Sequence, residues 1–275
     1  MALLIALARR TAIAPSRICV LLILWSLFAS SPLHAQERPK TVHVFVALCD
    51  NKNQGIVPVP EQLGRGDDPA RNLYWGAAYG VKTFFRRSAK WEWIAAPAVK
   101  RDGVLERIVF KHRGSNLFLV ADAYRGDRIR DAVTDFVASA GGENPETIDI
   151  RFDSAPVHLR ARGAADLVVY VGHNGLMDFR LPNPVSGKGR QSRQAIVLAC
   201  ASKPYFEVAL REAGAQPLLW TTGLMAPEAY TLAGALEGWA RNESAEQIRQ
   251  RAARTYHQYQ RCGLRAALRL FVTGW

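Results

Sequence analysis

The stretch 166-DLVVYVGHNGLMDF-179 decides how the rest of the sequence is interpreted. Its run of Leu, Val, Val, Tyr and Val is typical of a strand covered on both faces, and such strands belong to parallel sheets in α/β proteins. The run ends in a Gly-His-Asn-Gly turn that carries His173. Because ligands and catalytic groups gather at the carboxyl ends of strands in open α/β sheets, the stretch predicts a functional edge at His173.

A second apolar run, 195-AIVLACAS-202, ends in Cys200. If the two runs form neighbouring parallel strands, about 4.8 Å apart, His173 and Cys200 leave the same edge of the sheet within reach of each other. A thiol becomes a strong nucleophile when a base removes its proton, and an imidazole can be that base. Either residue alone is more often structural, so the predicted dyad depends on their joint placement.

Strands alternate with helical segments along most of the remaining sequence. This order predicts an α/β domain with a mainly parallel sheet and helices on both faces. Ser244 and Gln247 form a capping-box pattern at the start of one of the helices. The elements predicted by periodicity and turn residues are strands at 42–48, 166–172, 195–200 and 217–222, a hairpin from 104–110 and 117–121, and helices at 68–84, 127–140, 203–213, 227–241 and 244–260.

A hydrophobic block that ends in histidine and glycine, followed by a block that ends in Ala-Cys, resembles the cysteine peptidases of clan CD. This group includes the caspases, legumain, gingipain, clostripain and separase. The first strand and its exit, VFVALCDNKN, also resemble the caspase first strand and the polar turn after it. The resemblance implies a three-layer caspase-like fold over residues 36–275, with a core at 42–241, an added β-hairpin and a C-terminal helical extension at 242–275.

The resemblance implies a cysteine endopeptidase that works through a thioester acyl-enzyme. Cys200 would be the nucleophile and His173 the general base and acid. The backbone N–H of Cys200 and one from the histidine turn, at Asn174 or Gly175, would form the oxyanion hole. The family's glycine usually follows the histidine directly, whereas Asn174 intervenes here. A peptide or protein substrate is expected, and neither a metal nor an organic cofactor is implied.

Two carboxylates are placed to select a substrate with a basic side chain. Asp50 comes just after the first strand and Asp178 just after the histidine turn, so both are expected at the functional edge. Thr222 begins a segment expected to form one wall of the pocket. Arg65 and Arg71, in and after the loop that follows the first strand, offer the opposite preference, for an acidic residue.

Cys49 follows the first strand and is therefore a rival nucleophile at the same edge. An alternative is a disulfide with Cys262, which would leave Cys200 as the one unpaired thiol of the processed chain. The four remaining histidines of the processed chain show no metal-ligand spacing; they are His43, His112, His158 and His257.

The first 35 residues have the order of a secretory signal peptide: arginines, an apolar run from Ile18 to about Phe28, and a small-residue cleavage site near Ala35. The apolar run is shorter than the roughly 20 residues that a spanning helix needs. We therefore expect export to the periplasm or the outside, with no stable membrane anchor after cleavage; an uncleaved anchor is the alternative. Gly187-Lys188-Gly189 is predicted to be an exposed loop and a candidate maturation site.

The chain is basic, with a formal net charge of +12. Its arginines are dispersed and form no basic run with interleaved aromatic residues, so nucleic-acid binding is not predicted. An ordinary solvated surface explains this charge. The alternative function is a catalytically inactive binding module of the same fold, whose basic face meets a partner or an anionic polymer.

Overall fold

The structure, a computed structural model, describes residues 38–181 and 193–275. Residues Arg38–Trp275 form one compact unit. The predicted signal peptide and the Gly187-Lys188-Gly189 segment lie outside the described residues.

An eight-stranded sheet runs through the fold in the order β10-β9-β8-β7-β1-β4-β3-β2. The pairs β9–β8, β8–β7, β7–β1 and β1–β4 are parallel, whereas β3, β2 and β10 each pair antiparallel. The predicted α/β class with a mostly parallel sheet is therefore confirmed. The strands are β1 (Lys40–Ala47), β2 (Trp91–Ala95), β3 (Val104–His112), β4 (Leu117–Tyr124), β7 (Leu167–Val171), β8 (Gln194–Leu198), β9 (Gln216–Thr221) and β10 (Phe271–Val272).

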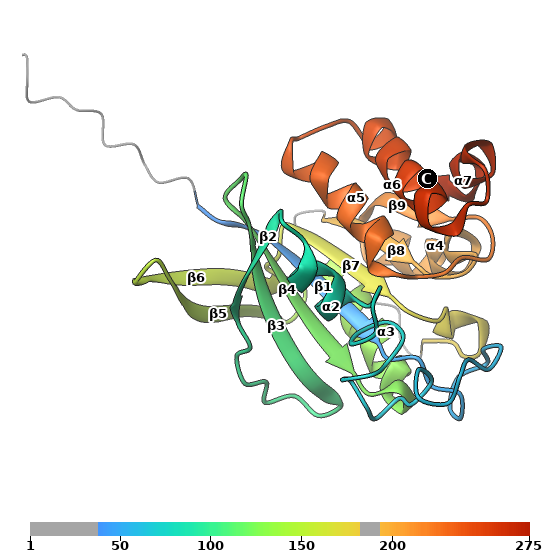
Figure 1. The fold of residues 1–275 in the computed structure, drawn as a ribbon, viewed down its shortest axis with the longest axis horizontal. Helices are drawn as coiled ribbons and strands as arrows, with labels where there is room; N and C mark the ends of the chain where they lie inside the picture. Colours follow the sequence, from blue (N-terminus) through green and yellow to red (C-terminus); the bar gives the residue numbers. More distant parts are fainter. Residues whose placement is uncertain (1–37, 182–192) are drawn as a thin grey trace, which may run out of the picture. The chain divides into compact units, whose positions relative to one another are not determined.

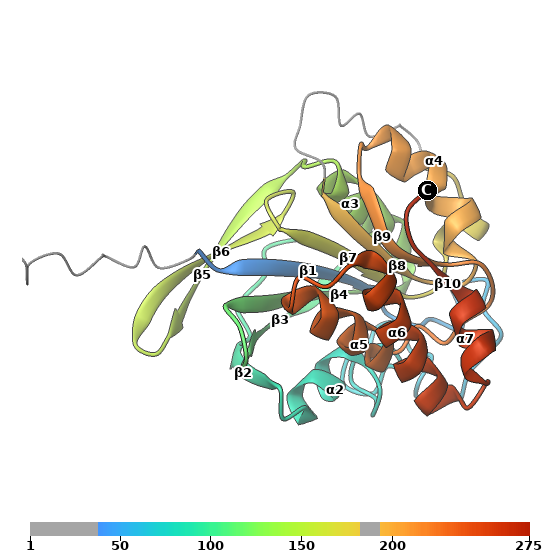
Figure 2. The same ribbon diagram turned by 90° about the horizontal axis from the view of Figure 1, so that it is seen from above.

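Helices cover both faces of the sheet, as Figure 2 shows. On one face the alternate residues Val42, Val44 and Val46 of β1 pack in a core with α2, α5 and α6. On the other face Phe45 and Ala47 pack in a core with α3 and α4. Burial of both faces explains why β7 and β8 are almost entirely apolar and why β1 is mainly apolar. The helices are α2 (Val81–Arg87), α3 (Ile129–Ala140), α4 (Ser202–Glu212), α5 (Ala229–Ala240), α6 (Ala245–Gln260) and α7 (Leu264–Leu270).

Most predicted elements are confirmed within a few residues. The hairpin of β3 and β4 is antiparallel as expected, and Ser244 and Gln247 form the capping box that starts α6. Helix α3 begins at Ile129, two residues later than predicted, because a 3₁₀ turn, η1 (Gly126–Arg128), precedes it.

The predicted helix at 68–84 is wrong over most of its length. Residues up to Gly80 form successive turns, and only α2 is helical. The fully buried side chain of Asn72 bonds the backbone of Cys49, with its Oδ1 accepting from Cys49 N at 3.0 Å and its Nδ2 donating to Cys49 O at 2.8 Å. This tertiary anchor, together with backbone that passes within 2.1 Å of where a Gly76 Cβ would lie, overrides the apolar spacing that favoured a helix.

A second hairpin was not predicted from the sequence. β5 (Pro145–Phe152) and β6 (Ala155–Arg162) form a separate two-stranded sheet, which extends away from the helices in Figure 1. Its apolar residues pack against β3 and β4 in a third core. Asp153 and Ser154 form its turn with positive φ angles of 47° and 64°, a conformation whose usual sequence signal is Asn-Gly. The Asp-Ser sequence of this turn therefore did not indicate a hairpin.

A buried ionic network links this hairpin to the sheet. Arg107 of β3 bonds Asp122 of β4 and also Glu146 of β5. Asp122 receives a further hydrogen bond from His43 Nε2 at 3.1 Å. Burial opposes ionisation of Asp122, yet His43 and Arg107 hold the pKa of its carboxyl well below the usual range. His43 is thereby explained as a structural residue.

The predicted C-terminal extension returns to the sheet. After α6 and α7, β10 pairs with β9 through Phe271↔Thr221 and Val272↔Trp220. Neither α7 nor β10 was predicted, since both are too short for their periodicity to stand out. Among the described residues no helix has the length and apolar character needed to cross a membrane.

Candidate active site

His173 and Cys200 follow neighbouring parallel strands at matching positions. β7 pairs with β8 in a register that ends at Val171↔Leu198, so each of the two side chains comes two residues after the last paired position of its strand. Strands in a sheet lie about 4.8 Å apart. The structure therefore confirms the predicted neighbouring of these strands and brings both residues to one edge of the sheet.

The turn that carries His173 requires the glycine before it. Gly172 has a φ of +151°, and a Cβ there would lie 3.0 Å from the carbonyl oxygen of Ala47 on β1. His173 itself is 8% exposed. Its carbonyl accepts a hydrogen bond from the Tyr170 hydroxyl at 2.7 Å, which fixes the backbone under the imidazole.

Asn174 ties the histidine turn to the cysteine turn. Its side chain is fully buried and donates from Nδ2 to the carbonyl oxygen of Cys200 at 2.7 Å. Its Oδ1 accepts from the backbone N–H of Leu176 at 3.1 Å. Asn174, which separates His173 from Gly175, thus bridges the two turns, because both the nitrogen and the oxygen of its side-chain amide form hydrogen bonds.

Cys200 lies in a sharp turn between β8 and α4, where it is partly exposed. Its Sγ is 3.4 Å from both the backbone nitrogen and the backbone oxygen of Met225. The next residue, Ala201, has the left-handed conformation, with φ 45° and ψ 39°. Such a conformation costs an alanine about 1–3 kcal/mol and is characteristic of functional turns. The strain lies directly beside the sulfur.

The predicted oxyanion-hole donors lie in these two turns. In the described part of the chain, the backbone N–H groups of Gly175 and Cys200 donate no hydrogen bond. Gly175 also has no room for a side chain, since a Cβ would lie 2.7 Å from the ring of Phe179. The backbone N–H of Asn174, the other predicted donor, likewise donates no hydrogen bond within the described residues, so all three candidate donors are unused by the fold around them.

Asp178 contacts His173. Its Oδ2 accepts from the imidazole Nε2 at 2.7 Å, and the same oxygen accepts from the backbone N–H of Gly55 at 3.2 Å. Its position in the sequence predicts that Asp178 binds a substrate cation. The carboxylate instead belongs to the histidine side of the site.

Asp50 is used by its own turn. The residue is buried, and its carboxylate accepts hydrogen bonds from the backbone N–H groups of Lys52 and Asn53 and from the Asn53 side chain. It is therefore not a free carboxylate for a substrate. Arg65 and Arg71, the basis of the opposite preference, are exposed and pair with Asp67 and Asp68 in their own segment.

The hydrogen bonds of Thr222 go to the C-terminal segment of the chain and not to Cys200. Its hydroxyl donates to the carbonyl oxygen of Arg269 at 3.0 Å, and its backbone N–H donates to that of Leu270 at 2.9 Å. The segment it begins does reach the site, because Met225 contacts the sulfur. Thr222 holds the start of this segment, and Met225 is the residue in it that contacts the sulfur.

Cys49 lies in a different environment from Cys200. It is fully buried, and burial raises the pKa of its thiol to about 11. A protonated and inaccessible thiol is a poor nucleophile, so its surroundings disfavour the rival role. The alternative, a disulfide between Cys49 and Cys262, is not formed: Cys49 is buried, Cys262 is exposed and both are free.

Two further residues of the site carry no recognisable sequence signal. Tyr74 lies close to both Cys49 and Cys200, and burial raises the pKa of its hydroxyl well above the usual value. Gly55 lies against Asp178 and comes from the loop after β1. Neither could be found by motif, because Tyr74 fell within the incorrectly predicted helix and Gly55 within a loop rich in turn residues.

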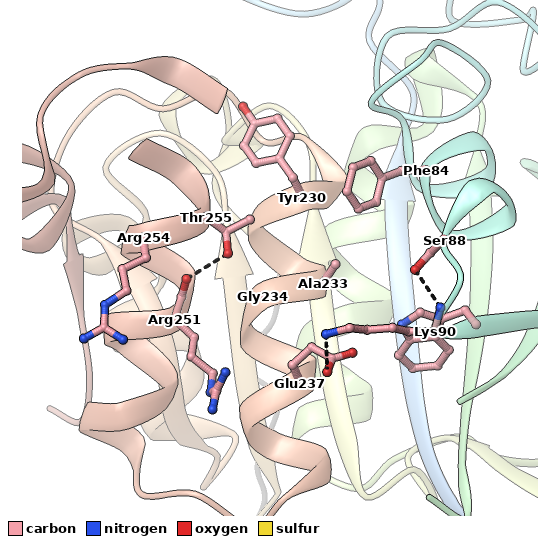
Figure 3. A pocket seen from close by; sticks show the side chains of 11 residues that line it. Phe84, Ser88, Lys90, Tyr230, Ala233, Gly234, Glu237, Arg251, Arg254 and Thr255 are labelled. Atoms are coloured by element: carbon pink, nitrogen blue, oxygen red, sulfur yellow. Dashed lines mark hydrogen bonds and ion pairs between the residues drawn. The ribbon is translucent and has the colours of Figure 1, made fainter. Parts of the chain in front are cut away.

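A separate cavity of about 310 Å³ lies over helix α5, where Figure 3 shows Lys90 reaching Glu237 beside Ala233 and Gly234. Lys90 pairs with Glu237 at 2.8 Å, and Arg251, also in its lining, pairs with Glu243. Its lining holds no cysteine or histidine. This cavity therefore offers no nucleophile and base comparable to those at Cys200.

No group of three or more His, Cys, Asp or Glu side chains in the described ranges is arranged to hold a metal ion. At the exits of β7 and β8 the structure places a thiol, an imidazole and backbone N–H groups. No protein-family model, curated protein or solved structure matches this chain.

Proposed function

We propose that the chain is an exported cysteine endopeptidase of caspase-like fold, with Cys200 as nucleophile and His173 as general base and acid. The observation that carries the proposal is the matched placement of the two residues beyond paired parallel strands. The Asn174 bridge, the strained Ala201 and the unused backbone donors support it.

The reaction would begin when the imidazole takes the proton from the Cys200 thiol. The sulfur then attacks the carbonyl carbon of the scissile bond, and the N–H groups of Cys200 and Gly175 stabilise the charge on its oxygen. When the tetrahedral intermediate collapses, the carbon–nitrogen bond breaks and His173 gives its proton to the leaving amine. Water, deprotonated by the same imidazole, then hydrolyses the thioester and restores the thiol.

The Met225 contacts bear on how the thiol is activated. The N–H of Met225 points at the sulfur and would stabilise the thiolate, whereas its carbonyl oxygen can accept only from the protonated thiol. The carbonyl contact is the observation that favours the second candidate, a catalytically silent binding module of the same fold. In that case the thiol would stay protonated and unreactive.

Asp50 is bonded within its own turn, and Oδ2 of Asp178 is bonded to His173 and Gly55. The preference for Arg or Lys before the scissile bond stays a prediction, which peptide cleavage tests. The test is a library of internally quenched peptides whose members carry Arg, Lys or Asp at that position. We expect cleavage of one class with a product that mass spectrometry can map, and loss of cleavage in Cys200→Ala. Cleavage that survives in Cys200→Ala, or a wild-type protein that cleaves nothing and whose Cys200 reacts no faster than a free thiol, contradicts the peptidase proposal.

A further inference from the structure

The hydrogen bond between Asp178 and His173 constrains which nitrogen of the imidazole can act as a base. A carboxylate accepts hydrogen bonds and, when ionised, donates none, so Nε2 must carry a proton in the contact with Asp178. In the neutral imidazole the lone pair is then on Nδ1. Within residues 38–181 and 193–275, Nδ1 forms no hydrogen bond with another residue.

The loop after β1 holds this carboxylate in place. The Gly55 N–H donates to the same Oδ2 that contacts the imidazole, and a Cβ on Gly55 would lie 2.5 Å from Asp178 Oδ1. Gly55 does not have a positive φ, so its lack of a side chain matters here for space. The fit of Asp178 between Gly55 and His173 therefore depends on a glycine at this point of the loop.

We propose that Asp178 is a positioning residue that keeps His173 in the Nε2–H tautomer with Nδ1 available to Cys200, and that Gly55 sets Asp178 for this task. The inference rests on the proposed function, since it concerns how its base is prepared. The catalytic group then consists of Cys200, His173 and Asp178, and Gly55 links it to the loop of residues 50–66. An Asp that orients a catalytic histidine in this way is worth a large factor in rate in serine peptidases.

The groups that can titrate around the imidazole are few. Besides Asp178 and Cys200 there are Tyr170, whose hydroxyl bonds the His173 carbonyl, and Tyr74, whose hydroxyl pKa burial raises well above the usual value so that it also stays neutral. Burial, with a contribution from Asp178, raises the pKa of Tyr170 far above the usual value, so this residue stays neutral over the range of the test. The response to pH between 6 and 9 should therefore come from the other groups.

The test measures the rate at which iodoacetamide alkylates Cys200 as a function of pH, in the wild type and in Asp178→Ala, Gly55→Ala and His173→Ala. At pH 7 we expect all three variants to react at least about tenfold more slowly, in line with loss of general-base assistance. The rates should converge above the ordinary thiol pKa of about 8.5, where a cysteine ionises without help. Asp67→Ala, which removes an exposed carboxylate directly after the same loop, should stay within about twofold of the wild type.

One internal readout and one comparison between variants keep the outcomes distinct. Cys49 is fully buried, so its continued protection shows that each variant is folded. If Asp178→Ala and Gly55→Ala react like the wild type while His173→Ala is slow, the positioning role is overturned and the proposed function stands. If His173→Ala also reacts like the wild type, the proposed function itself fails.

A spectroscopic measurement tests the tautomer directly. In ¹⁵N-histidine-labelled protein, correlation spectra distinguish the protonated from the unprotonated ring nitrogen of neutral His173, assigned by its absence in His173→Ala. We expect Nε2–H in the wild type and a mixture of tautomers in Asp178→Ala and Gly55→Ala. A wild-type protein with the proton on Nδ1 would overturn the inference.

Discussion

Two strands of one sheet end in cysteines at the same edge, and the two cysteines have different surroundings. After β1, Cys49 is fully buried, with Asn72 bonded to both its N–H and its carbonyl. After β8, Cys200 is partly exposed, and Asn174 bonds only its carbonyl. Both cysteines therefore lie at the same edge of the sheet, but the turn after each strand determines whether the sulfur is accessible to a substrate.

The two turns also differ in backbone conformation. Ala201, after Cys200, has the left-handed conformation and leads directly into α4. Asp50, after Cys49, starts a loop that its own carboxylate stabilises. The first arrangement points a side chain outward at a cost in strain, and the second covers it. We therefore expect Cys200, after β8, to take part in catalysis, and Cys49, after β1, to contribute to the stability of the fold.

The largest expected difference is in turnover. Cys200→Ala should reduce peptide cleavage by at least about 10³-fold, because removing a nucleophile leaves only the contribution of binding and of the oxyanion donors. Cys49→Ala should leave turnover within about twofold, since it deletes one buried sulfur away from the substrate. Steady-state rates on the best peptide of the library provide the measurement. Equal losses in both variants would show that the two exits act as one unit.

The two asparagines give a second, smaller contrast. Asn174→Ala removes the partner of the Cys200 carbonyl and of the Leu176 N–H, and Asn72→Ala does the same for the Cys49 backbone. Each should lower the free energy of unfolding by about 1–3 kcal/mol, the penalty for buried groups left without partners.

The labelling of the two cysteines should separate these variants. We expect Asn174→Ala to slow alkylation of Cys200 by about tenfold through loss of geometry, and Asn72→Ala to speed alkylation of Cys49 by exposing it. Mass spectrometry of tryptic peptides resolves the two sites. If either variant changes both cysteines to the same extent, the exits are not independently held.

Alkaline pH should affect the two cysteines differently as well. A thiol in an unfolded chain ionises near pH 8.5, whereas burial keeps Cys49 protonated until about 11. Between these values the unfolded state loses a proton that the folded state retains, so the free energy of unfolding falls as pH rises from about 9 to 11, by on the order of 2 kcal/mol. Below pH 8 the thiol is protonated in both states and contributes nothing to the pH dependence.

Urea unfolding at several pH values tests this point. Cys49→Ala should remove part of the decline, while Cys262→Ala, which changes an exposed thiol, should leave it intact. An unchanged decline in Cys49→Ala would mean that other groups, such as Tyr74, account for it.

The smallest expected effect concerns Cys262. Because this cysteine is exposed and free, Cys262→Ser should change the free energy of unfolding by less than about 0.5 kcal/mol. A disulfide to Cys49 would make the loss about 2–4 kcal/mol. Thiol counting on unreduced, denatured protein provides an independent check, with all three cysteines of residues 38–275 expected to react.

Much of the sheet was predictable because its strands are buried on both faces. β7 and β8 are almost entirely apolar and β1 and β9 mainly so, which makes all four easy to find without tertiary information, and their common edge follows from the parallel connections. The half-exposed hairpin of β5 and β6 was not predictable, because its pairing depends on the Arg107–Glu146 ion pair and on packing against β3 and β4.

At the candidate site, the sequence located the two residues that end buried strands but not the partners that orient them. His173 and Cys200 could be found because each follows an apolar run. The bridging role of Asn174 and the contact of Asp178 with His173 depend on how short turns close, and Gly55 reaches Asp178 from a distant part of the chain. Side-chain direction in a turn is a tertiary property, and so Asp178 was assigned to the substrate.

The most direct test of the central claim is the ratio of the alkylation rates of Cys200 and Cys49 at pH 7, measured in the wild type and in His173→Ala by time-resolved mass spectrometry. We predict that Cys200 reacts at least about tenfold faster than Cys49, and that His173→Ala slows Cys200 alone. Slow and equal labelling of the two cysteines, unchanged by His173→Ala, would contradict an activated thiol at the exit of β8.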